Sequence, residues 1–116
     1  GAVIANNKTF DFEIGNNSEE IYISYVDASR LLKEMIIKVE DFEVKEKAIK
    51  QEDGSIIENS VLYLNEIRLG DDYAENVKVI VKKGLPATFV IGDNYISSEW
   101  GHYRVDKEKG MIIFDK

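Results

Sequence analysis

The amino-acid sequence predicts an all-β fold, a small closed or partly closed β-barrel with one or two short helices. Short segments alternate apolar and polar residues with the period of half-buried strands, as in "KTFDFEI" at 8–14 and "VKVIVKK" at 77–83. Turn-forming residues separate these segments, and the strand–helix–strand rhythm of a parallel sheet is absent from the sequence. The 116 residues fit one domain, 1–116.

Two strands are predicted in the first 25 residues. The first strand, at 8–14, places three apolar side chains on one face, namely Phe10, Phe12 and Ile14. The segment "GNNSEE" that follows is typical of a hairpin loop. The same alternation then returns on a second strand, at Ile21, Ile23 and Tyr25.

A short helix is predicted next, in "DASRLLKEMII" at 27–37. Its apolar residues fall at helical spacing, at Leu31, Leu32, Met35 and Ile36. Asp27 and Ser29 precede them, and either is a good N-cap because its side-chain oxygen can accept hydrogen bonds from the first turn.

Two hairpins are predicted in the middle of the chain. The first joins "FEVKEKAIK" at 42–50 to "SIIENSVLYL" at 55–64, and the pair "DG" at 53–54 favours a tight reversal between them. The second joins "LNEIRLG" at 64–70 to "VKVIVKK" at 77–83 through the predicted turn "DDYAEN".

The last third of the chain predicts a buried strand, a short helix and a closing hairpin. "LPATFVIG" at 85–92 is almost wholly apolar, which is typical of a strand covered on both faces. "DNYISSEW" at 93–100 favours one or two helical turns, and "HYRVDKEKGMIIF" at 102–114 turns back through "KEKG". Core or interface packing is predicted for an aromatic cluster beside this hairpin, formed by Tyr95, Trp100 and Tyr103.

Composition excludes several classes of function. The chain carries 15 basic and 22 acidic residues, a net charge of −7, with no separate cluster of Lys and Arg, so nucleic-acid binding is disfavoured. The absence of cysteine excludes disulfides, thiolate metal sites and cysteine nucleophiles. No cofactor motif is present. The longest apolar runs are far shorter than the roughly 20 residues of a membrane span, so a soluble domain is expected.

Two groups of polar residues resemble functional sites but are interpreted as surface. Asp71, Asp72 and Glu75 lack the alternating ligands of a calcium loop, so a solvated turn is favoured. His102 has no serine in a nucleophile-elbow pattern to act on and is interpreted as a strand surface residue. The compartment stays open, since one hypothesis is that an export signal or further domains were removed before Gly1.

Five segments follow one another in a distinctive order. An apolar strand runs into "VDAS", a hairpin carries "EDGS", and "LNEIRLGDDYAENVKVIV", "FVIGDNYI" and "YRVDKEKGMIIF" follow. This order resembles the retropepsin-like (retroviral-type) aspartic proteases, particularly their small bacterial members, over nearly the whole chain. The resemblance implies a barrel of the acid-protease type and a buried strand that ends at Gly92. It also implies a flap-like hairpin with its tip at Gln51, Glu52, Asp53, Gly54 and Ser55.

The catalytic triplet of that family is missing. The chemistry of the family needs two aspartates, one from each of two lobes or subunits, which share a proton and activate a water. Each aspartate stands in Asp-Thr-Gly or Asp-Ser-Gly, and neither triplet occurs here. An ungapped match puts Tyr25, Val26 and Asp27 at the triplet, followed by Ala28 and Ser29.

A second match assigns Asp27 to the catalytic aspartate but deletes two residues from the loop. Deletion from a strained functional turn costs more than substitution, so the ungapped match is favoured and Asp27 is interpreted as a helix cap.

Three functions therefore stay open. The leading hypothesis is a catalytically impaired domain that binds an extended peptide or protein segment by strand pairing, or serves in assembly as one lobe of a larger protein. The second is an active aspartic peptidase that uses Asp27 in a homodimer or with a partner domain. The third is a purely structural barrel. None of them requires a metal, a cofactor, a nucleic acid or a membrane span.

Overall fold

The computed structural model describes residues 1–115 and confirms the predicted β-barrel. Its strands are β1 (Ala2–Ala5), β2 (Lys8–Gly15), β3 (Ile21–Ser24), β4 (Val61–Leu69), β5 (Asp72–Lys82), β6 (Phe89–Gly92), β7 (Tyr103–Asp106) and β8 (Met111–Phe114). Its helices are α1 (Tyr25–Lys33), the 3₁₀ turn η1 (Val39–Asp41), α2 (Lys45–Ala48) and α3 (Asp93–Trp100). None of these helices is long and apolar enough to cross a membrane.

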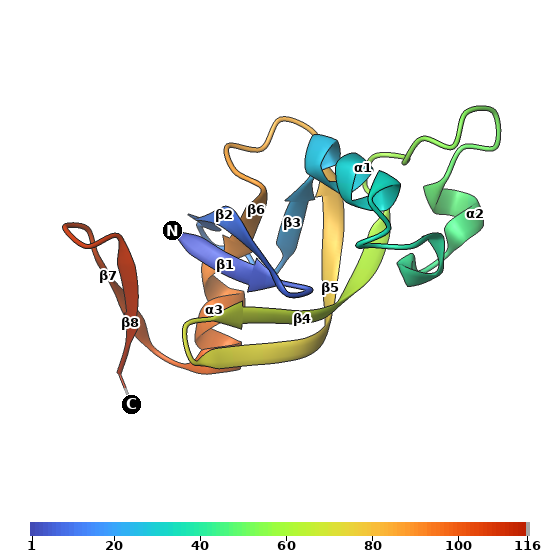
Figure 1. Cartoon of the computed structure of the whole chain (residues 1–116). Coiled ribbons are helices and arrows are strands. Elements are labelled where there is room, and N and C mark those ends of the chain that lie inside the picture. Colours follow the sequence, from blue (N-terminus) through green and yellow to red (C-terminus); the bar gives the residue numbers. More distant parts are fainter. Residues whose placement is uncertain (116) are drawn as a thin grey trace.

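Six strands close the barrel in the order β1-β2-β6-β3-β5-β4, while β7 and β8 form a separate two-stranded sheet. Figure 1 shows this C-terminal hairpin standing away from the barrel beyond α3, with α2 at the opposite side of the molecule. The barrel interior is apolar and fully buried, with Ile23, Val79, Val81, Phe89 and Ile91 each 0% exposed. Burial of each such side chain contributes about 1.5 to 3 kcal/mol, so this core dominates the stability of the domain.

The sequence pattern does not predict the first strand, β1. β1 pairs antiparallel with β2, and the two join through Asn6 and Asn7, whose φ angles are 47° and 68°. Asparagine tolerates this left-handed conformation, which a two-residue hairpin turn of type I′ requires at both positions. The segment "AVIA" lacks alternating polar residues, which is why its sequence pattern did not predict a strand.

The hairpin predicted between residues 8–14 and 21–25 is wrong, because β6 lies between its two strands. β6 runs parallel to β2 and antiparallel to β3. Gly92, at the end of β6, passes against the chain that precedes β3, and a Cβ atom there would lie 2.1 Å from the carbonyl oxygen of Ser18. Only glycine fits this crossing.

Only the tip of the long hairpin predicted at 42–64 is present in the structure. Lys45–Ala48 forms α2 instead of a strand, with Ala48 buried and the charged residues exposed. Lysine, glutamate and alanine favour helix, and their alternation with single apolar residues imitates a strand pattern. The reversal at Gly54 is confirmed by its φ of 75° and by a bridge between Ile49 and Ile56.

The β4–β5 hairpin is confirmed, with one correction to its turn. The predicted turn at 71–76 belongs mostly to β5, because the chain reverses at Gly70 and Asp71 and pairs Leu69 with Asp72. The buried strand, the short helix after it and the closing hairpin are confirmed as β6, α3 and β7–β8. The helix predicted at 27–37 ends earlier, at Lys33, so Met35 lies outside it and is 72% exposed.

Candidate functional site

The five positions matched to the catalytic loop, 25–29, form the first turns of α1. Ser24 caps this helix, and its hydroxyl oxygen accepts a hydrogen bond of 3.4 Å from the backbone N–H of Asp27. The expectation that Asp27 or Ser29 is the N-cap is therefore wrong, and Tyr25 opens the helix instead of ending the second strand. Ser24 has the right chemistry for a cap, but the strand pattern of "IYISY" concealed it.

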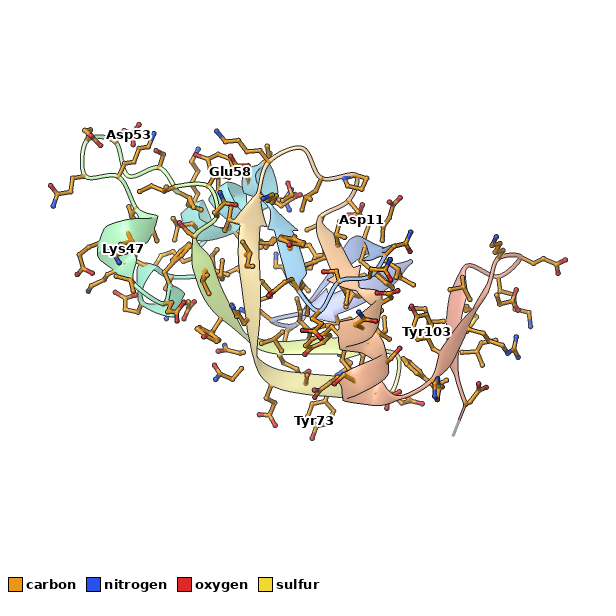
Figure 2. All side chains as sticks on the ribbon, turned by 180° about the vertical axis from the view of Figure 1, so that it is seen from behind. Asp11, Lys47, Asp53, Glu58, Tyr73 and Tyr103 are labelled. Carbon is orange, nitrogen blue, oxygen red and sulfur yellow. The ribbon has the colours of Figure 1, made fainter. Side chains whose placement is uncertain are left out.

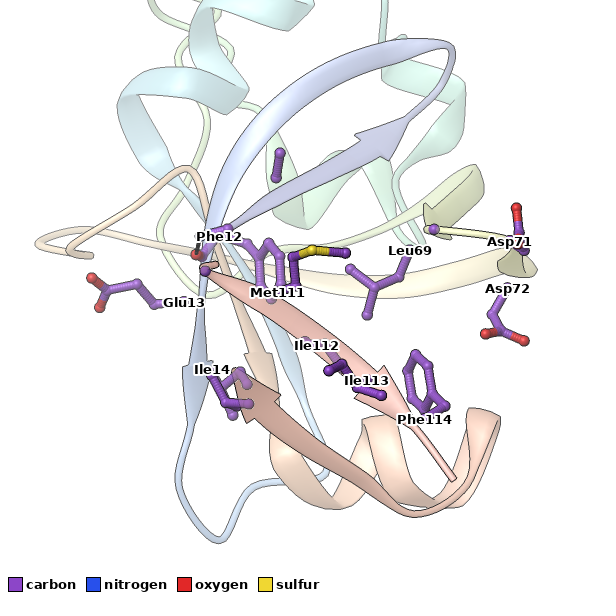
Figure 3. Close-up of a pocket in the computed structure, with 15 residues that line it drawn as sticks. Phe12, Glu13, Ile14, Leu69, Asp71, Asp72, Met111, Ile112, Ile113 and Phe114 are labelled. Atoms are coloured by element: carbon purple, nitrogen blue, oxygen red, sulfur yellow. Dashed lines mark hydrogen bonds between the residues drawn. The ribbon is translucent and has the colours of Figure 1, made fainter. Parts of the chain in front are cut away.

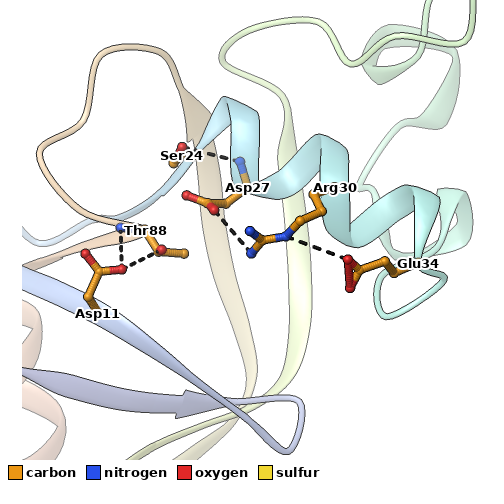
Figure 4. A network of polar contacts seen from close by, with 6 residues as sticks. All are labelled: Asp11, Ser24, Asp27, Arg30, Glu34 and Thr88. Carbon is orange, nitrogen blue, oxygen red and sulfur yellow. Dashed lines mark hydrogen bonds and ion pairs between the residues drawn. The ribbon is translucent and has the colours of Figure 1, made fainter.

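The Asp27 carboxylate faces its own helix. One carboxylate oxygen lies 3.2 Å from the Arg30 guanidinium, which also lies 3.8 Å from Glu34 (Figure 4). In the first turn, Asp27 also interacts favourably with the positive end of the helix dipole. These contacts are local and partly exposed, so each contributes at most about 1 kcal/mol. They explain Asp27 as a surface residue that stabilises α1.

Tyr25 stands where the ungapped match would place a catalytic aspartate. Its ring packs against the edge of the core, and the Lys83 ammonium lies 4.7 Å from the ring centroid. This is a cation–π contact on an exposed lysine, worth about 0.5 to 1 kcal/mol. The position thus presents an aromatic ring to its surroundings instead of a carboxylate.

A polar bridge between Asp11 and Thr88 connects β2 to the segment before β6, beside the start of α1. The sequence pattern did not indicate this bridge. The Asp11 carboxylate of β2 accepts hydrogen bonds from the Thr88 hydroxyl at 2.6 Å and from the Thr88 N–H at 3.3 Å (Figure 4). The Thr88 carbonyl in turn accepts a hydrogen bond of 2.8 Å from the N–H of Ser24. This bridge connects β2 to the capping residue of α1. Asp11 occupies an ordinary polar position of an alternating strand, so no sequence signal marks it.

The bridge predicts a pH effect on stability. The hydrogen bond from the Thr88 hydroxyl lowers the pKa of Asp11 below its ordinary value of 3.8. A carboxylate with a lowered pKa in the folded state stabilises the protein above its unfolded pKa, and that contribution is lost as the pH falls through the folded pKa. We expect Asp11→Asn to lower the melting temperature near neutral pH and to have little effect at acidic pH.

Thermal melts of both proteins between about pH 2 and 7 check this expectation. Glu75→Gln removes a carboxylate from an exposed position of β5 and is the matched control. A destabilisation by Asp11→Asn that is the same at all pH values would contradict the role of the ionised carboxylate.

A large hollow lies between the barrel and the C-terminal hairpin. We call it the hairpin groove; β2 lines it at Phe12, Glu13 and Ile14, the β4–β5 turn at 69–72, and the hairpin at Val105 and 110–114. Gly1 and Ala2 also line it, and its volume is about 920 Å³. This is the size of a small-ligand or peptide-binding cleft. Apolar side chains such as Phe12, Leu69 and Met111 meet in it (Figure 3).

An aromatic cluster connects the C-terminal hairpin to α3, and the predicted cluster of Tyr95, Trp100 and Tyr103 beside this hairpin is confirmed. The Trp100 ring lies at the end of α3 between Tyr95 and Phe114, with centroid distances of 5.7 and 6.4 Å. Tyr103 contacts Phe114 at 6.2 Å, and the Trp100 indole N–H donates a hydrogen bond of 3.2 Å to the Tyr73 carbonyl. Burial, with a smaller contribution from Glu99, raises the pKa of Tyr95 to about 12. The cluster thereby sets one wall of the hairpin groove.

The residues of the flap-like tip, 51–55, lie far from this groove. Gln51, Glu52, Asp53 and Gly54 are exposed, and Figure 2 shows Asp53 and Tyr103 at opposite ends of the molecule. A cavity of about 200 Å³ lies near the tip, between α2 and the start of β4. Neither this cavity nor the hairpin groove is lined by residues 25–29.

The sequence as a whole finds no match among protein-family models or curated proteins. The structure is similar to a solved structure of a retropepsin-like aspartic protease from Rickettsia conorii, with a TM-score of 0.59 and 17% sequence identity over 91% of this chain and 74% of that chain. The barrel therefore has a retropepsin-like fold. The fold that the order of the five segments implied is confirmed, although the two chains share few residues.

Within this retropepsin-like fold, the residues predicted as sites do not come together. Positions 25–29 lie at the start of α1, the tip at 51–55 lies beyond α2, and Gly92 is buried against Ser18. Sequence reasoning missed the hairpin groove, because its walls come from segments that are distant in the chain. Among residues 1–115, no three His, Asp or Glu side chains gather in a way that could hold a metal ion.

Proposed function

We propose that this chain is a catalytically impaired domain of retropepsin-like fold that binds an extended segment of another polypeptide. The observation that supports it best is the state of positions 25–29, which form a capped helix instead of a catalytic loop. An aspartic protease needs two carboxylates that share a proton. Here Tyr25 brings an aromatic ring to the matched position, and Asp27 pairs with Arg30 on its own helix.

The hairpin groove supports the binding part of the proposal. Its lining is mostly apolar and includes the strand β8. Among the described residues, β8 pairs only with β7, so its other edge is open. Extended segments commonly bind by adding a strand to such an edge, while their side chains occupy apolar pockets beside it. A domain without a catalytic pair can retain this mode of binding.

One experiment tests both parts. A pool of short unstructured synthetic peptides is incubated with the protein at acidic and neutral pH, bound peptides are recovered by size-exclusion separation, and all peptides are examined by mass spectrometry. We expect recovered peptides to be intact at every pH. Cleaved peptides that disappear with Asp27→Asn would overturn the proposal in favour of an aspartic peptidase, and a pool that leaves no peptide bound would favour a structural barrel.

Asp27→Asn should also have little effect on stability. The substitution removes a partly exposed ion pair with Arg30 and a carboxylate near the helix N-terminus, so we expect a loss of about 1 kcal/mol or less. Urea denaturation measures this loss. Glu34→Gln, which removes the other ion pair of Arg30, is the matched control. A loss several times larger would show that Asp27 has contacts beyond its helix.

A further inference from the structure

Building on the proposed function, we propose that the hairpin groove binds a basic, extended segment of a partner protein, which adds a strand to the outer edge of β8. Strand geometry, apolar lining and charge each support this assignment. The catalytic-loop positions 25–29 take no part in it.

The edge of β8 lies along the groove. Five consecutive residues, 110–114, line it, so the strand runs the length of the hollow. The N–H of Asp115 donates to the carbonyl of His102 at 2.9 Å, which fixes the register of β8 on β7. In an antiparallel pair alternate residues turn their backbone groups to the partner strand, so those of Ile112 turn away from β7 to the open edge of β8. An incoming strand can pair there.

Apolar side chains provide pockets for such a strand. Phe12 and Leu69 form the buried wall on the barrel, at 5% and 6% exposure. On the hairpin, Val105 and Met111 are 46% and 53% exposed, which is unusual for two large apolar residues beside one hollow. Exposed apolar residues gathered at a groove mark an interaction surface, because their burial by a partner is favourable. Alternate apolar residues of the incoming strand would cover them.

The charge of the groove selects the partner. Glu13 lies at one end and Asp71 and Asp72 lie at the other, with the apolar side chains between them (Figure 3). Among residues 1–115, none of the side chains that line the groove is basic. The ammonium of Gly1 also lies there and donates to the Phe12 carbonyl at 3.4 Å. A segment with Lys or Arg at its ends would meet carboxylates at both ends.

A second copy of the chain fits less well. It would bring the same three carboxylates and a further net charge of −7 to the same interface. Like charges placed together oppose association and lower its rate. The partner is therefore basic where this chain is acidic.

The probe is a fluorescent peptide that alternates lysine and valine over about eight residues, long enough to span β8. Two matched peptides replace lysine with glutamate or carry N-methyl groups on alternate amides, which prevents strand pairing. Binding is measured by fluorescence anisotropy at physiological ionic strength. We expect the lysine peptide to bind the wild-type protein at least about tenfold more tightly than either matched peptide.

Two double variants locate the binding. Glu13→Lys with Asp71→Lys reverses charges at both ends of the groove and should weaken binding of the lysine peptide by about tenfold. Glu46→Lys with Glu52→Lys makes the same change of net charge at one exposed position of α2 and one of the flap-like tip, and should alter binding less than about twofold. Circular dichroism confirms that both variants fold, and NMR shift changes should centre on 110–114.

The outcomes separate this inference from the proposed function. Equal binding of the lysine and glutamate peptides, or equal effects of the two double variants, would overturn the basic partner while intact peptides from the pool still supported a binding domain. Sedimentation of the wild-type protein as a dimer with β8 at its interface would identify a second copy as the occupant and also overturn it. Cleavage of the lysine peptide would instead overturn the proposed function.

Discussion

Gly92→Ala is expected to prevent the barrel from folding. The added Cβ atom would lie 2.1 Å from the Ser18 carbonyl oxygen and 2.8 Å from that of Glu20, and both are backbone atoms that cannot turn aside. The Gly92 N–H also donates to the Glu20 carbonyl at 2.8 Å, so moving the strand away would break this bond. We expect a loss of at least about 4 kcal/mol, a large part of the stability of a domain this size. Urea denaturation and NMR spectra measure it.

Gly54→Ala is the matched control. Gly54 has a φ of 75° but open space around it, so alanine there costs only the conformational strain, about 1 kcal/mol. If Gly92→Ala melts within a few degrees of Gly54→Ala, the close crossing of β6 and the chain before β3 would be wrong.

Trp100→Ala is expected to release the C-terminal hairpin while the barrel stays folded. The substitution removes ring contacts with Tyr95 and Phe114 and the hydrogen bond to the Tyr73 carbonyl. Losing a half-buried tryptophan with these contacts should cost about 2 to 4 kcal/mol. Hydrogen exchange should then speed up over 103–114 and stay slow in the barrel strands, and the lysine peptide should no longer bind.

Trp100→Phe separates packing from the hydrogen bond. It keeps an aromatic ring between Tyr95 and Phe114 but cannot donate to Tyr73, so we expect a loss of about 1 kcal/mol and a hairpin that remains in place. Unchanged exchange of 103–114 in Trp100→Ala would show that other contacts fix the hairpin.

The sequence was a good guide wherever structure depends on neighbouring residues. Strict alternation predicted β2 and β5, the pair at 53–54 predicted the reversal, and the apolar run before Gly92 predicted β6. The same local rules failed for α2, where lysine and glutamate between single apolar residues imitate a strand. They also misplaced the cap of α1, because Ser24 completes a strand pattern and caps the helix that follows.

Local sequence patterns could not predict which distant segments contact one another. The position of β6 between β2 and β3 depends on pairing between Phe12 and Phe89, which no local pattern specifies. The hairpin groove depends on where Trp100 holds β8, and its carboxylates come from β2 and from the distant β4–β5 turn. The candidate binding site was therefore found only in the folded structure.

The insertion of β6 between β2 and β3 has a consequence for the order of folding. β2 and β3 are consecutive in the chain, yet both pair with β6, which is synthesised much later. The bridge between Asp11 and Thr88 alone spans 77 residues. Closing so long a loop is entropically costly and slows folding. During synthesis on the ribosome, the first part of the barrel would expose two open strand edges until β6 emerges. The domain should therefore depend on rapid completion or on chaperones to avoid aggregation at this stage.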